Sequence, residues 1–161
     1  MFLAFLLRGF SLPAHEFLRG LLSVYGVQLH QLTPNSLLHI ACFVTLCESF
    51  LGIEPHFLLW RSIFRLRPNV SLARKPKLGG AVVSVRPEAQ YFEFSMAASV
   101  QGWRTKWFYI KDRKSSPEDK YGLPPFDASQ EIKKLTSWDA LPSDAEAQEI
   151  LPLLSRIKSL K

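Results

Sequence analysis

Residues 33–52 read TPNSLLHIACFVTLCESFLG, and this stretch decides the fold. Thr33 supplies a side-chain oxygen that can cap a helix, and Pro34 suits the first helical position. Apolar residues then cover most of the circumference, which indicates a helix at the centre of a core rather than one lying on the surface. Gly52 is a natural end for such a helix. The only clearly polar side of the helix carries Asn35, Ser36, His39 and Ser49.

One more helix is predicted on each side of this one. Before it, apolar residues recur at the helical period up to a stop at Gly26. After it, Pro55 begins a helix that is predicted to continue up to Pro68. Short connections between the three helices predict a compact helical unit over residues 11–67. The apolar run that comes first, residues 2–7, fits a strand as well as it fits a helix.

The chain changes character after this unit. Residues 68–80 contain prolines, glycines and basic residues, which predicts a basic linker or loop. Three runs of β-type residues follow, at Ala81–Val85, Tyr91–Phe94 and Trp103–Ile110. Their β-branched and aromatic content predicts a small antiparallel sheet.

The C-terminal part is predicted to be helical after a polar loop. Residues 113–130 are polar and interrupted by prolines, so we expect them to be exposed. Ser143 and Glu146 have the spacing of a capping box, which predicts that a helix begins there. Pro152 falls inside that helix and is expected to kink or divide it.

The fold class predicted from these segments is α+β, with an N-terminal three-helix unit, a small antiparallel sheet and a C-terminal helical tail. We expect one globular unit in three parts. These are a helical part at 1–67, a basic linker and small β-sheet at 68–114, and a polar loop with a C-terminal helical segment at 115–161.

Composition and charge narrow the class of protein. The chain has 161 residues, 47% hydrophobic and 21% charged, which is a globular balance. Residues 1–114 hold 14 Lys and Arg against 6 Asp and Glu, a net charge of +8, whereas residues 115–161 are net −2 with 6 against 8. An anionic partner is therefore expected to meet the first two thirds of the chain.

Location is predicted from the cysteines and from the apolar segments. Cys42 and Cys47 are too few for a disulfide framework and lie five positions apart on one helix, so they cannot pair with each other. The N-terminal apolar run lacks the basic start of a signal peptide, and no apolar stretch reaches membrane-spanning length. We expect an intracellular protein, nuclear or cytoplasmic, with no membrane and no small-molecule substrate.

The candidate functional residues are basic and aromatic. Between Pro55 and Pro87 there are seven basic residues and no acidic one, and Trp103–Lys111 mixes cations with aromatic rings. Such residues can meet phosphates and stack on bases, which points to RNA or DNA as partner. Alternatively, Trp103, Trp107 and Tyr109 form the buried face of a strand. The candidate nucleic-acid-binding residues are Arg61, Arg65, Arg67, Arg74, Lys75, Lys77, Arg86, Trp103, Arg104, Lys106 and Lys111.

No catalytic, cofactor or metal site is predicted. A nuclease needs clustered carboxylates to hold divalent metals, and the glutamates at 16, 48, 54, 88 and 93 are scattered. A zinc site needs close ligand pairs, and His39 with Cys42 is the nearest approach to one. The apolar residues around this pair predict buried thiols that behave as small hydrophobes.

Several motifs resemble the gypsy-type transposon domain family of plants. They are RGFSLP at 8–13, LHQLTPNS at 29–36, His39-Ile40 and LGIEPH at 51–56, with Gly102-Trp103 and WFY at 107–109 as a weaker continuation. The resemblance implies a protein derived from a plant retrotransposon, Gag-like or accessory, from a family without an established catalytic site. Since members of the family carry more chain on both sides, we expect a fragment or a decayed copy of the element.

Three classes of function stay open at this point. The first is a non-catalytic, Gag-like protein that binds nucleic acid through a basic face and forms homo-oligomers. The alternative is a protein-interaction or scaffold module without nucleic-acid binding, which requires an exposed apolar patch. The most distant alternative is a metal-dependent transposase or nuclease, which requires convergent carboxylates.

Overall fold

The computed structural model describes residues 1–69, 78–87, 89, 99–110 and 122–160. Its helices are α1 (Leu3–Leu6), α2 (Glu16–Tyr25), α3 (Pro34–Thr45), α4 (Phe57–Ile63) and α5 (Asp144–Ser159), with short turns η1 (Leu29–Gln31), η3 (Trp103–Thr105) and η4 (Thr136–Trp138). The π-helical turn η2 (Leu46–Leu51) extends α3, and the strands are β1 (Phe64–Pro68) and β2 (Ala81–Val85). The predicted α+β class is confirmed.

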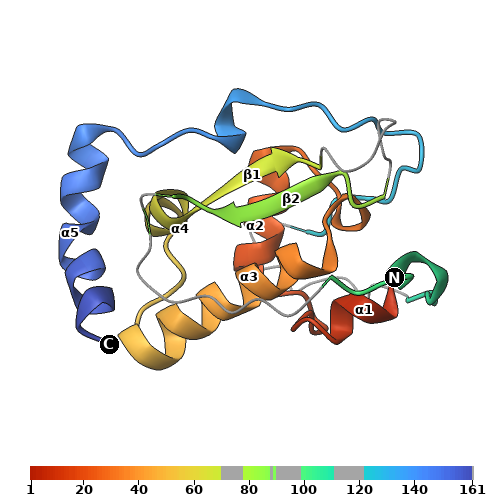
Figure 1. Cartoon of the computed structure of the whole chain (residues 1–161), viewed down its shortest axis with the longest axis horizontal. Coiled ribbons are helices and arrows are strands. Elements are labelled where there is room, and N and C mark those ends of the chain that lie inside the picture. Colours follow the sequence, from red (N-terminus) through yellow and green to blue (C-terminus); the bar gives the residue numbers. More distant parts are fainter. Residues whose placement is uncertain (70–77, 88, 90–98, 111–121, 161) are drawn as a thin grey trace.

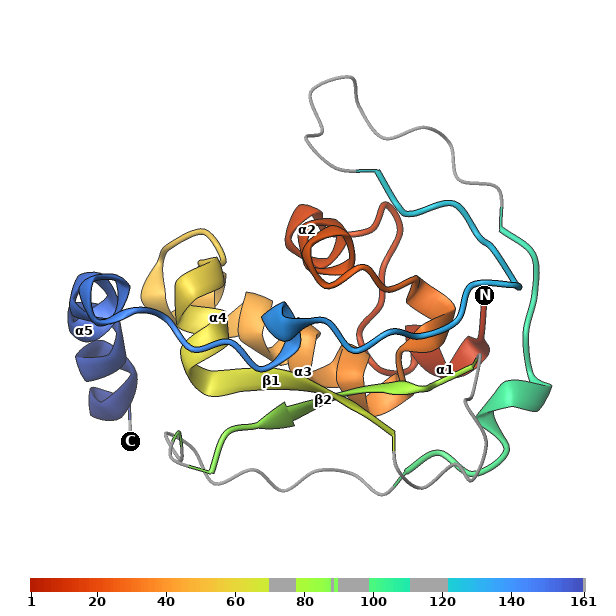
Figure 2. The same cartoon turned by 90° about the horizontal axis from the view of Figure 1, so that it is seen from above.

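The central helix lies between α2 and the two-stranded sheet (Figure 2). As predicted, Thr33 caps it by accepting the Ser36 amide, and Gly52 closes it with a φ of 63°. The expected polar side is only partly right, because Ser36 and His39 are buried. The Ser36 hydroxyl accepts the Val83 amide at 2.9 Å, so this polar side chain joins the helix to β2.

Contrary to the expectation that no apolar stretch reaches membrane-spanning length, residues Pro34–Leu51 are long and apolar enough, by length and composition alone, to cross a membrane. In the fold, 44% of this segment is buried inside the protein. Leu37, Ile40, Phe43, Cys47 and Leu51 belong to the core cluster. A core helix passes the same test of length and hydropathy, and the core is the role that the fold gives to this segment.

The helix predicted to run from Pro55 up to Pro68 is shorter in the structure. It ends at Ile63, and the chain continues directly as β1. Phe64 and Leu66 are buried, whereas Arg65 is half-buried and Arg67 is exposed, a period of two that suits a half-buried strand. The strand pairs antiparallel with β2 from Phe64 opposite Val85 to Pro68 opposite Ala81. Hydrogen bonding to a distant partner overrides the local helical pattern here.

The rest of the predicted sheet is only partly present. Ala81–Val85 is a strand as expected, and Tyr91–Phe94 lies outside the described residues. Trp103–Ile110 was wrongly predicted to be a strand. It begins with the η3 turn and continues as extended chain with one isolated bridge, between Trp107 and Phe2. Gly102, with a φ of 64°, starts that turn.

The C-terminal segment runs past the hairpin to α5, which packs beside α4 (Figure 1). The capping box of Ser143 and Glu146 is present as predicted. Pro152 does not divide the helix. The carbonyl of Gln148, which loses its amide partner to this proline, belongs to an exposed residue that water can reach.

The core draws on all three predicted parts of the chain. Its largest members include Phe5, Phe43 and Trp60 of the N-terminal part, and Val83 from β2 joins them. Trp138 has no exposed surface and donates its indole N–H to the Tyr25 carbonyl at 2.8 Å. Arg156 donates to the Leu51 carbonyl at 2.6 Å, so the C-terminal segment completes the fold of the N-terminal helices.

Candidate functional site

The described cations Arg67, Arg104 and Lys106 lie at or near the end of the β1–β2 hairpin where Pro68 pairs with Ala81. Arg67 is exposed near the end of β1, and the Asn69 amide donates to the Gly80 carbonyl at 2.8 Å. The η3 turn packs against the same end, where Arg104 donates to the Leu78 carbonyl at 3.2 Å. Figure 2 shows this end of the hairpin near the N-terminus and the green η3 turn. The exposed Lys106 follows directly after η3.

Close backbone approach fixes η3 on the hairpin. Gly79 has a φ of 65°, and a Cβ atom placed on it would lie 2.7 Å from the Trp103 ring. Only glycine fits there without displacing the indole. Trp103 itself is half-buried, with its ring 4.8 Å from that of Phe2 and 5.6 Å from that of Phe5. The Arg104 guanidinium lies 4.9 Å from the Trp103 ring centroid, close enough for a cation–π contact.

The segment after η3 is held by the N-terminus. Leu3 donates its amide to the Lys106 carbonyl at 2.9 Å, and Phe108 donates to the Met1 carbonyl at 2.8 Å. The Met1 ammonium group donates to the Phe108 carbonyl at 2.6 Å, and burial lowers the pKa of this amine. These hydrogen bonds are made by the backbone, and the Trp107 and Tyr109 side chains remain exposed to solvent. Trp107 is 56% exposed and Tyr109 is 89% exposed, so these rings are not the buried strand face proposed as an alternative.

Three more of the predicted contact residues have partners inside the chain, as Arg104 does. Arg86 is 6% exposed and donates to the Arg61 carbonyl at 2.7 Å, to Asp139 at 3.2 Å and to the Ala140 carbonyl at 3.1 Å. Burial lowers the pKa of its guanidinium, and Asp139 opposes that shift. Arg61 donates to the carbonyls of Ala140 and Leu141, and Arg65 lies 3.6 Å from Asp139. These arginines tie the C-terminal segment to α4 and the sheet.

Four more predicted contact residues lie outside the described residues. They are Arg74, Lys75, Lys77 and Lys111.

The two members of the His39–Cys42 pair differ in burial. His39 is buried with its ring 5.4 Å from that of Phe64, whereas Cys42 is exposed, contrary to the expectation that both thiols are buried. Partial burial raises the pKa of the Cys42 thiol, and burial raises that of Cys47 to about 11. Neither thiol is poised as a thiolate at neutral pH.

We expect His39 to make stability depend on pH. Burial lowers the pKa of its imidazole to about 4, against about 6.5 when unfolded. The unfolded chain therefore binds the proton first, and stability is lost as pH falls from about 6.5 towards 4. The loss is on the order of 3 kcal/mol. Urea unfolding at pH 7.5 and at pH 4.5 measures it, and His39→Leu should reduce the difference between the two pH values.

The matched control for this prediction is His56→Gln, which removes a histidine that is less buried than His39. The prediction is wrong if His39→Leu keeps the full pH dependence of the unaltered chain.

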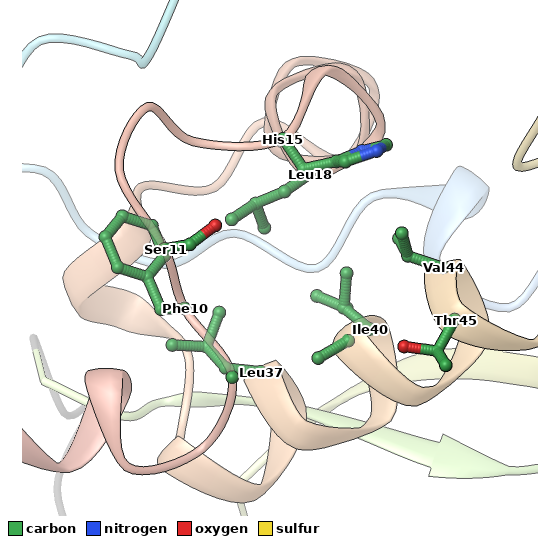
Figure 3. A pocket seen from close by; sticks show the side chains of 10 residues that line it. Phe10, Ser11, His15, Leu18, Leu37, Ile40, Val44 and Thr45 are labelled. Carbon is green, nitrogen blue, oxygen red and sulfur yellow. The ribbon is translucent and has the colours of Figure 1, made fainter. Parts of the chain in front are cut away.

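A small cavity between α2 and α3 has His15 in its lining (Figure 3), and the His15 imidazole pairs with the Glu48 carboxylate. The cavity measures about 140 Å³, and its lining is mostly aliphatic. His15 Nε2 lies 2.9 Å from Glu48 Oε1, while Nδ1 accepts the Phe17 amide at 3.1 Å. Both ring nitrogens are occupied, so the imidazole has no lone pair left to activate the Ser11 hydroxyl.

Three glutamates that appear scattered in the sequence share one hollow. Glu16, Glu48 and Glu54 line about 500 Å³ between α2 and the start of α4, together with His15. Over the described ranges, however, no group of three or more His, Cys, Asp and Glu side chains is arranged to hold a metal ion. No sequence signal links His15 to Glu48, because the fold alone joins these helices.

Comparison with known proteins gives the family of the N-terminal part. Residues 1–68 match the family model described as "Putative gypsy type transposon". This part of the chain is similar to the gypsy-type transposon family. The resemblance read from the sequence motifs is therefore confirmed. No curated protein and no solved structure matches the chain.

The matched residues 1–68 supply α1 to β1 and include Arg67, while Arg104 and Lys106 lie beyond them. The candidate basic surface is thus assembled from the matched domain and from the chain that follows it.

Proposed function

We propose that this transposon-derived chain is a non-catalytic, Gag-like accessory protein that binds nucleic acid electrostatically. The observation that carries the proposal is the gathering of Arg67, Arg104 and Lys106 at one end of the hairpin. Residues 1–114, which include all three, have a net charge of +8. Lysine and arginine that meet phosphates release counterions, which supplies affinity without sequence specificity. The proposal includes an intracellular location, in nucleus or cytoplasm, and no cofactor.

Our test replaces two exposed cations at this end. We expect Arg67→Ala/Lys106→Ala to weaken binding to labelled single-stranded RNA and to make its salt dependence shallower. Each lost contact to a single strand changes the log–log slope by about 0.7, so the double variant should change it by roughly 1.4. Fluorescence anisotropy between 25 and about 200 mM salt measures both quantities.

The matched control is Lys133→Ala/Lys134→Ala, which removes two exposed cations from the C-terminal segment. The proposal predicts that this variant keeps the slope of the unaltered protein. An equal change in both double variants would mean that net charge alone attracts the RNA. The absence of binding at low salt would remove nucleic acid from the function.

Self-association is a second candidate, and one surface favours it. A hollow of about 600 Å³ beside α3 and η2 is almost wholly apolar. Its lining includes the exposed Phe50, at 63%, and Leu160, at 45%. Exposed apolar surface of this kind is typical of contacts between proteins. Sedimentation velocity over a range of concentrations distinguishes a homo-oligomer from a monomer.

A further inference from the structure

We propose that the segment Lys106–Ile110 is a stacking platform for single-stranded nucleic acid, with Tyr109 and Trp107 as the rings that contact unpaired bases. This inference rests on the proposed function, since it names the form of nucleic acid that binds at the hairpin end with Arg67, Arg104 and Lys106. It assigns binding to two aromatic residues in addition to the cations.

Exposure is the first reason. Four successive apolar residues stand in solvent, with exposed fractions of 56% for Trp107, 36% for Phe108, 89% for Tyr109 and 40% for Ile110. A folded chain normally buries such residues, and the tryptophans Trp60 and Trp138 have no exposed surface. An exposed run of this kind marks a binding surface.

Rigidity is the second reason. The backbone of the segment is hydrogen-bonded on both sides of Trp107, from Leu3 to the Lys106 carbonyl and from Phe108 to the Met1 carbonyl. The Trp107 and Tyr109 rings meet edge to face, with centroids 5.2 Å apart and planes at 90°. Because backbone and rings are held before binding, little further order has to be imposed when a base stacks.

Charge decides which partner fits. Lys106 adjoins the rings in the chain, and Arg104 lies at the same end of the hairpin. Aromatic faces beside cations suit a strand whose bases are unstacked and whose phosphates are free to turn toward the lysine and arginine. The bases of a duplex are stacked on each other and do not present their faces. The combination therefore favours a single strand, RNA or DNA.

The experiment compares Tyr109→Ala and Trp107→Ala with the unaltered protein on single-stranded RNA, single-stranded DNA and duplex RNA. Loss of one stacked base should weaken single-strand binding between about 5-fold and about 150-fold. The salt slope should stay unchanged, because no phosphate contact is lost. Tyr109→Phe keeps the ring and should keep the affinity. Binding to duplex RNA should be insensitive to all three substitutions.

The outcomes separate this inference from the proposed function. If salt-dependent binding persists but Tyr109→Ala and Trp107→Ala match the unaltered protein, the platform is wrong and the electrostatic function stands. If nothing binds even at low salt, both fail. If sedimentation shows that Tyr109→Ala abolishes an oligomer without changing RNA affinity, the exposed rings join copies of the chain and the inference is overturned. Equal losses on single strands and duplex would also overturn it.

Comparing single-stranded RNA with single-stranded DNA shows which of the two nucleic acids the platform binds. Stacking alone predicts similar effects of Tyr109→Ala on RNA and on DNA of the same sequence, since both present the same base faces. A larger effect on RNA would show that the 2′-hydroxyl is contacted as well, and the platform would then be an RNA site. Circular dichroism of each variant confirms that the fold is retained, as expected for a tyrosine that is 89% exposed.

Discussion

Replacing Trp138 with alanine should destabilise the whole protein by about 3–5 kcal/mol. Trp138 has no exposed surface, and its indole N–H donates to the Tyr25 carbonyl at 2.8 Å. The substitution therefore opens a large cavity and also removes a buried hydrogen bond. The affected carbonyl belongs to the last residue of α2, within the matched residues 1–68, although Trp138 itself lies 70 residues beyond them.

Urea unfolding followed by circular dichroism measures this effect. The matched control is Trp107→Ala, which removes the same side chain where it is 56% exposed and should change stability by less than about 0.5 kcal/mol. Trp138→Phe keeps much of the packing but loses the donor, so an intermediate loss of about 1–3 kcal/mol is expected. If Trp138→Ala unfolds at the same urea concentration as the unaltered chain, the C-terminal segment is not part of the cooperative core.

The sequence features that predicted the helix ends correctly are local ones. Thr33 caps α3, and Ser143 with Glu146 forms the capping box of α5, because the side chains that satisfy the first amides of a helix stand within three residues of them. Gly26 and Gly52 end their helices with φ angles of 62° and 63°, values that glycine adopts at little cost. Such chemistry can be read from a few neighbouring residues.

The errors arose where distant partners decide the structure. Phe64–Pro68 continues the apolar pattern of α4, yet it pairs with a strand that begins 13 residues later and becomes β1. Trp107 lies on extended chain because it meets Phe2, more than 100 residues earlier in the sequence. Periodicity within a window contains no information about either partner.

The candidate site follows the same rule. The sequence identifies a basic stretch, but it does not show which arginines are exposed to a ligand and which have partners inside the chain. Asp139 and Ala140 lie more than 50 residues after Arg86, and only the fold brings their oxygens to that guanidinium. Trp103, Trp107 and Tyr109 were predicted to share one environment, whereas the fold half-buries Trp103 and exposes Tyr109.

Arg86 is where a structural role and a binding role can be separated most sharply. We expect Arg86→Ala to lower the free energy of unfolding by about 2–4 kcal/mol, because hydrogen bonds to a charged group contribute more than neutral ones. The Arg61 carbonyl loses the 2.7 Å bond, and Asp139 is left with Arg65 at 3.6 Å. Asp139 is 43% exposed in its side chain, so water solvates part of the carboxylate and keeps the loss below that of a fully buried pair.

The opposite behaviour is expected of Arg67→Ala. Arg67 is exposed on β1, so its loss should change stability by less than about 0.5 kcal/mol while weakening single-stranded RNA binding. Arg86→Ala, measured well below its unfolding temperature, should leave the RNA affinity and its salt slope unchanged. Should Arg86→Ala instead reduce affinity with no loss of stability, the guanidinium must leave Asp139 and Ala140 to meet a phosphate. The C-terminal segment would then have to move on binding, since Arg61 and Arg86 both donate to the Ala140 carbonyl that holds it.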